Sequence, residues 1–119
     1  MLNSGANRLR AELLALIDTQ LGNASGQRHN PYWTSSTGYN LKSWEVEGYS
    51  ACRSLLYAAK PRALESAWSY ADRLLKQLEA LKNVYRESSA DEDGGGVGAV
   101  GSVILELERR RWASAGSSR

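Results

Sequence analysis

The amino-acid sequence predicts a mainly all-α protein. We expect a small helical bundle built on an αα-hairpin, with a long aromatic-containing loop and a tethered C-terminal segment. Apolar residues recur at helical spacing in three long segments, and a single proline, Pro61, separates the last two of these segments. The 119 residues, 42% hydrophobic and 24% charged, have the size and composition of one ordinary globular domain with one core.

The first helix is predicted over about residues 4–21. Ser4 can cap its beginning, and Gly22 followed by Asn23 can end it. The apolar residues of its buried side recur at steps of three and four: Ala6, Leu9, Leu13, Leu16 and Ile17.

A polar segment rich in Gly, Ser and Asn follows, from Gly22 to Asn40, and predicts a loop. A loop of this length inside a compact domain is usually functional or poorly ordered. Trp and Tyr are common anchors of protein interfaces. We therefore predict a partner-binding site made of the aromatic residues in and beside this loop: Tyr32, Trp33, Tyr39 and Trp44.

Two further helices are predicted over about residues 41–59 and 61–87, and we expect them to form the αα-hairpin, with the first helix packed across it. Pro61 suits the first position of the later helix, where a missing N–H is tolerated. The later helix has the most regular apolar pattern in the chain. On its outer side, Asp72 and Lys76 have the spacing of an i,i+4 ion pair.

The apolar seam of this later helix has two interpretations. Leu74, Leu78, Leu81 and Tyr85 can join two copies of the chain in a homodimer, or another helix of the same chain can cover them. Both remain open, because one sequence does not distinguish intramolecular from intermolecular helix packing.

Residues 89–98 have the composition of a flexible acidic and glycine-rich linker. This divides the chain into a helical domain (1–88), the linker, and a C-terminal amphipathic segment with its tail (99–119). Val100, Val103 and Leu107 have helical spacing, although β-branched residues between glycines also suit a strand. We favour a helix, because Glu106 and Arg110 are spaced for an ion pair.

Two glycine- and acid-rich motifs resemble ligand sites. Gly96 to Gly101 matches GxGxxG, but acidic residues rather than a strand precede it, so a linker is the better interpretation. Asp91 and Asp93 resemble the beginning of a calcium loop, but Ser102 stands where a bidentate Glu is required. We expect no cofactor and no metal.

Catalytic groups are equally scarce. His29 is the only histidine and lies in the polar loop, where we expect a solvated turn residue. Cys52 is the only cysteine and fits a small buried apolar position, so neither a disulfide nor a thiolate zinc cluster is expected. The sequence therefore predicts a protein that is not an enzyme.

The charge distribution gives a second candidate site. The formal net charge of +2, from 15 basic and 13 acidic residues, is too small for a strong attractive field toward nucleic acid. The one dense basic run and its neighbouring ring can contact phosphates and a base, or can simply complement a helix C-terminus. These residues are Arg109, Arg110, Arg111 and Trp112.

The expected function follows from this inventory. We expect a non-enzymatic protein-interaction module that binds a macromolecular partner, such as a regulator, adaptor, assembly factor or phage- or plasmid-type inhibitor. The alternative is a small nucleic-acid-binding protein that uses the arginine run and the loop aromatics. Without a signal-peptide pattern or an apolar run of about 18 residues, we expect a cytoplasmic location and no membrane partner.

Overall fold

The computed structural model describes residues 4–28, 36–88, 90–91 and 94–117. These residues form four helices: α1 (Ser4–Arg28), α2 (Ser36–Ala58), α3 (Ala67–Glu87) and α4 (Gly95–Ser117). The described ranges contain no strand. The all-α fold class is therefore confirmed, and the segment 99–112 is helical.

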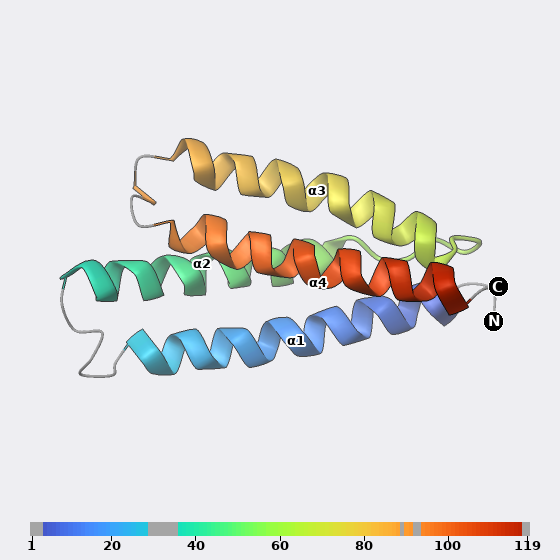
Figure 1. Cartoon of the computed structure of the whole chain (residues 1–119), viewed down its shortest axis with the longest axis horizontal. Helices are drawn as coiled ribbons and strands as arrows, with labels where there is room; N and C mark the ends of the chain where they lie inside the picture. Colours follow the sequence, from blue (N-terminus) through green and yellow to red (C-terminus); the bar gives the residue numbers. More distant parts are fainter. Residues whose placement is uncertain (1–3, 29–35, 89, 92–93, 118–119) are drawn as a thin grey trace.

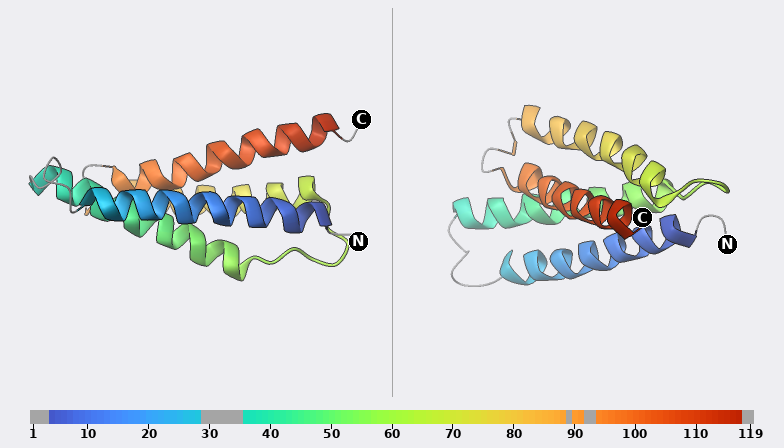
Figure 2. Two further views of the ribbon diagram at one scale, coloured as in Figure 1. Left: turned by 90° about the horizontal axis from the view of Figure 1, so that it is seen from below. Right: turned by 45° about the vertical axis from the view of Figure 1, so that its right-hand side comes forward.

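The four helices form an elongated bundle of 49 × 26 × 24 Å in which each helix runs antiparallel to the next along the chain (Figure 1). α1 and α2 form one hairpin and α3 and α4 form another, and the two hairpins pack mainly through α2 and α4 (Figure 2). The expected hairpin of α2 with α3 is wrong, because these two helices hardly touch. The connection over residues 59–66 runs across the end of the bundle, so α3 begins away from α2.

One hydrophobic core runs through the bundle and receives side chains from every helix. Fully burying one side chain such as Leu, Ile or Val contributes about 1.5–3 kcal/mol to folding. The largest fully buried side chains are Leu13, Ile17, Cys52, Leu56, Tyr70, Leu74, Leu78, Val100, Val103 and Leu107.

α1 and α2 both extend into the segment predicted as a loop. α1 continues to Arg28, past Gly22, because Leu21 packs against the core and Ala24 is buried. This burial offsets the low helix propensity of glycine. α2 begins at Ser36 rather than at residue 41.

α3 begins at Ala67, six residues later than Pro61 suggests. The reason is a serine cap: the Ser66 hydroxyl accepts a hydrogen bond of 3.1 Å from the backbone N–H of Ser69. A serine in this position satisfies one of the free N–H groups at a helix start. Pro61 lies instead in the connection between α2 and α3.

Arg73 and Tyr70 hold this connection against α3. The guanidinium of Arg73 donates to both carboxylate oxygens of Glu65, at 2.7 and 2.9 Å, and to the carbonyl of Lys60 at 2.8 Å. The buried Tyr70 hydroxyl donates to the carbonyl of Ala59. Hydrogen bonding to Arg73 lowers the pKa of Glu65 from 4.5 to about 2.

α4 begins at Gly95, inside the segment predicted as a linker. The carboxylate of the buried Asp91 accepts hydrogen bonds from the backbone N–H groups of Gly96 and Val97, at 3.0 and 3.1 Å. Gly94 adopts φ +74°, a left-handed conformation that glycine takes without strain. The linker prediction is therefore wrong for Asp91 and residues 94–98: the acidic residue caps a helix, and α4 packs as a full member of the bundle.

The glycines at the start of α4 serve close packing. A Cβ atom on Gly48 of α2 would lie 2.8 Å from the Cβ of Ala99, and one on Gly95 would clash with the Leu41 carbonyl. A Cβ atom on Gly96 would enter the ring of Tyr85. α2 and α4 therefore approach each other closely where Gly48 and Gly95 have no side chain.

Candidate functional site

Of the four aromatic residues predicted as a partner-binding site, the structure describes the side chain of Trp44 alone. Tyr32 and Trp33 lie outside the described residues, as does His29. Tyr39 belongs to α2, but its side chain is outside the described part. Trp44 packs edge-on against Tyr85, with ring centroids 6.0 Å apart, and so contributes to the core rather than to an exposed site.

The predicted dimer seam on α3 is covered within the same chain. Leu74 and Leu78 are fully buried, Tyr85 is buried, and Leu81 is partly buried against the core. The hydroxyl of Tyr85 donates to the carbonyl of Glu47, at 3.4 Å. Of the two interpretations of this seam, the structure supports the one in which the same chain covers it, because other helices of the bundle, mainly α4, pack against α3.

The arginine run lies near the end of α4, and each guanidinium is paired with a carboxylate. This pairing lowers the positive potential that the run offers to a phosphate. The Glu106–Arg110 pair that the spacing predicts is present, as is the Asp72–Lys76 pair. The arginine contacts are Arg109 with Glu106 at 3.3 Å, Arg110 with Glu106 at 2.7 Å and Glu12 at 3.8 Å, and Arg111 with Asp72 at 3.4 Å.

The most exposed aromatic group of the described residues lies beside this run. Trp112 is 72% exposed and meets Trp68 of α3 edge-on, with ring centroids 6.2 Å apart; Trp68 is itself 40% exposed. The guanidinium carbon of Arg111 lies 3.8 Å from the centroid of the Trp68 ring. We call Trp68, Trp112 and Arg111 the tryptophan cluster. The sequence pattern of either helix alone does not pair Trp68 with Trp112, because their contact depends on the register of α3 and α4.

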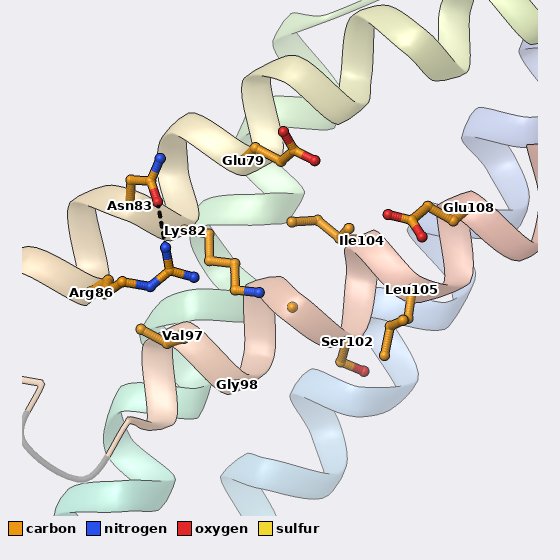
Figure 3. A pocket seen from close by; sticks show the side chains of 11 residues that line it. Glu79, Lys82, Asn83, Arg86, Val97, Gly98, Ser102, Ile104, Leu105 and Glu108 are labelled. Atoms are coloured by element: carbon orange, nitrogen blue, oxygen red, sulfur yellow. Dashed lines mark hydrogen bonds between the residues drawn. The ribbon is translucent and has the colours of Figure 1, made fainter.

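A groove of about 720 Å³ runs between α3 and α4 (Figure 3). Along the groove, the positively charged residues are separated from the negatively charged ones. Lys82 and Arg86 lie toward the beginning of α4, whereas Glu108 lies further along α4, and Glu79 lies between Lys82 and Glu108 (Figure 3). We call this surface the α3/α4 groove.

The four charged side chains of the α3/α4 groove form no ion pair with any residue that the structure describes. Arg86 donates a hydrogen bond of 2.9 Å to the side-chain oxygen of Asn83, which is uncharged. Elsewhere on α3 and α4, Asp72, Lys76 and all three arginines of the run are paired, whereas Glu87 at the end of α3 is not paired with a described residue.

Two glycines of α4 line the same groove and are not explained by packing within the chain. A Cβ atom on Gly98 would meet nothing within 4 Å, and one on Gly101 would meet only the end of the Lys82 side chain, at 3.5 Å. Glycine inside a helix is less stable than alanine by about 0.5–1 kcal/mol. Unlike Gly48, Gly95 and Gly96, these two leave an open strip on the outer side of α4.

The remaining groups with chemical reactivity are buried or scattered. Burial raises the pKa of the Cys52 thiol to about 12 and so keeps it protonated. Among the described residues, no group of three or more His, Cys, Asp or Glu side chains is placed to hold a metal ion. None of the helices in the described part of the chain is long and apolar enough to cross a membrane.

The fold and these surfaces define a four-helix bundle protein with an exposed tryptophan cluster and a groove whose charges form no ion pair with the residues that the structure describes. No family model, curated protein or solved structure matches the chain. The case for a function therefore depends on the chemistry of these two surfaces.

Proposed function

We propose that this chain is a non-enzymatic protein-interaction module that binds a macromolecular partner through the tryptophan cluster. The observation that carries the proposal is the exposure of Trp112, 72%, beside the half-buried Trp68. Trp and Arg are the residues most enriched at the energetic centres of protein interfaces. An exposed indole that is held in place by neighbours is a suitable anchor for such a centre.

The contacts within the cluster favour binding because they restrict its side chains before a partner arrives. Trp112 leans on Trp68, and Arg111 lies over the Trp68 ring while its guanidinium contacts Asp72 at 3.4 Å. Ordering a side chain at an interface costs about 0.5–1.5 kcal/mol, and a preordered side chain avoids part of this. The cluster fits a protein that offers an apolar pocket for an indole, with acidic side chains at its rim to meet the exposed Arg109.

The experiment is affinity capture from a lysate of the source organism with the wild type and the variants Trp112→Ala, Val84→Ala and Trp33→Ala. We expect the wild type to retain a specific partner and Trp112→Ala to lose it. Val84→Ala is the matched control, because Val84 is an apolar residue of α3 that is 64% exposed and lies outside the cluster. Circular dichroism shows whether each variant is folded.

The same experiment separates the cluster from the aromatic loop. If Trp33→Ala abolishes capture and Trp112→Ala does not, the binding site is the loop of Tyr32 and Trp33 and the cluster is not the site. If Trp112→Ala binds as the wild type does, or if the wild type captures no specific partner, the proposal for the cluster fails.

A further inference from the structure

We propose that two copies of this chain associate through the α3/α4 groove, related by a two-fold axis that crosses the groove between Glu79 and Lys82. In this dimer Lys82 of each copy faces Glu79 of the other, and Arg86 lies level with Glu108 of the other across the groove. This surface is separate from the tryptophan cluster, and it is also separate from the buried seam of α3.

The register of α3 against α4 sets the positions of the charges along the groove. Three contacts fix it: Asp72 pairs with Arg111, Lys82 reaches Gly101, and the ring of Tyr85 lies against Gly96. Since both helices rise by about 1.5 Å per residue, Glu108 lies level with Leu75, about one turn from Glu79 toward the start of α3.

The resulting charge pattern is self-complementary. Arg86 lies one helical turn beyond Lys82 in one direction, and Glu108 lies about one turn beyond Glu79 in the other (Figure 3). A rotation of 180° about an axis that crosses the groove at the midpoint of Glu79 and Lys82 therefore places Lys82 of one copy against Glu79 of the other. It also brings Arg86 of one copy, on α3, level with Glu108 of the other, on α4 across the groove. A two-fold interface requires this property, because the same patch must fit itself.

The shape of the groove is self-complementary about the same two-fold axis as its charges. Leu105 of α4 is 65% exposed, whereas Gly98 and Gly101 leave an open strip about one to two turns earlier in the same helix. The same rotation places Leu105 of one copy over the glycine strip of the other. Each leucine then fills space next to a helix backbone, and the two otherwise unexplained glycines acquire a packing role.

We prefer a second copy over an unrelated helix as the occupant, because a second copy already has the side chains that match the charges and the open strip of the groove. It supplies two carboxylates, two cations and an apolar side chain in the required order. Charge complementarity of this kind fixes register and excludes wrong pairings more than it adds affinity. The dimer is therefore expected to be sensitive to charge reversal.

The test measures the mass of the full chain by size-exclusion chromatography with light scattering at micromolar concentrations. We expect the wild type to be dimeric. Lys82→Glu and Glu79→Lys each place like charges opposite each other twice, so each alone weakens dimerisation by about tenfold or more. Lys60→Glu is the matched control: it makes the same charge change at an exposed position of the α2–α3 connection and leaves the dimer intact.

Mixing the two variants gives a decisive outcome. Lys82→Glu has two carboxylates where Glu79→Lys has two cations, so an equimolar mixture forms a heterodimer although neither variant pairs with itself. A monomeric wild type, or a dimer that both single variants retain, overturns the proposal. Trp112→Ala leaves this dimer unchanged, so failure of the dimer and failure of the tryptophan cluster as a binding site are distinguishable.

Discussion

Gly48 of α2 and Ala99 of α4 face each other so closely that a Cβ atom on Gly48 would lie 2.8 Å from the Cβ of Ala99. The same atom would lie 3.0 Å from the carbonyl oxygen of Gly96. Neither neighbour is the end of a flexible side chain, so the backbones themselves must separate to make room. The two hairpins of the bundle are therefore joined where side chains are smallest.

We predict that Gly48→Ala lowers the free energy of unfolding by about 1–3 kcal/mol, because it overpacks this crossing. Gly22→Ala is the control: it is also a helical glycine, but an added Cβ meets nothing within 4 Å. Alanine at this control position should increase stability by about 0.5–1 kcal/mol through helix propensity. Urea unfolding followed by circular dichroism measures both changes, and equal effects would contradict the close crossing.

Asp91→Ala should lower the free energy of unfolding by about 1–2 kcal/mol, because two N–H groups at the start of α4 lose their acceptor. Asp91→Asn keeps one side-chain oxygen and should be destabilised less. Urea unfolding of the three chains measures the order wild type, Asn, Ala. A wild-type value for Asp91→Ala would show that the carboxylate does not cap the helix.

Glu65 should give the chain a pH-dependent stability at acidic pH. Its pKa is lowered from 4.5 to about 2 in the folded state, so the unfolded chain takes up the proton first as the pH falls. The contribution of the Glu65–Arg73 pair is therefore complete above about pH 4.5 and is lost as the pH falls toward 2. Arg73 is the main cause of the shift, through its hydrogen bonds to the carboxylate.

The corresponding variant is Glu65→Gln, which should reduce stability by about 1–2 kcal/mol at neutral pH and by progressively less as the pH falls toward 2. Urea unfolding at a series of pH values measures the difference. Asp72→Asn is a useful comparison, because its carboxylate is more exposed, 44% against 9% for Glu65. A difference between wild type and Glu65→Gln that does not change with pH would contradict the assigned pair.

Cys52 should be unreactive in the folded protein. It is fully buried, and its raised pKa, about 12, leaves almost no thiolate at neutral pH. A thiol-specific reagent should therefore label it only when the bundle opens, and urea should accelerate labelling. Rapid labelling of the native chain would show that the Cys52 side of α2 is not buried in the bundle.

The nucleic-acid alternative can be tested by measuring binding to an oligonucleotide. Because each arginine of the run is paired with a carboxylate, we expect no binding of single-stranded RNA or DNA at about 50 mM salt, where phosphate contacts are strongest. Fluorescence anisotropy with a labelled oligonucleotide measures this. Binding that weakens steeply with added salt and is lost in Arg109→Ala would favour the alternative instead.

The helices were largely predictable from the sequence because their core sides repeat at steps of three and four. Leu13, Ile17, Leu74 and Leu78 are buried as the periodicity indicates. Two helix ends were predicted wrongly. α3 begins after the capping Ser66 and not at Pro61, and α1 continues past Gly22 because the burial of Ala24 outweighs local helix propensity.

The linker and the surfaces were harder to predict, for a different reason. Gly95 and Gly96 have the composition of a tether, and only the facing residues of α2 and α3 show that they permit close contact. Likewise, Trp68 and Trp112 are far apart in sequence and meet only because α3 and α4 are antiparallel. The periodicity of one helix alone does not show which of its residues will contact a given residue of another helix.

The beginning of α1 and the end of α4 lie at the same end of the bundle, close to the start of α3 (Figure 1). An affinity tag or fusion partner on either terminus is therefore held near Trp68 and Trp112 and can obstruct them. Ala90 is exposed in the connection at the opposite end. Because Cys52 is shielded, a cysteine introduced at Ala90 would allow immobilisation that leaves both indoles facing the solution.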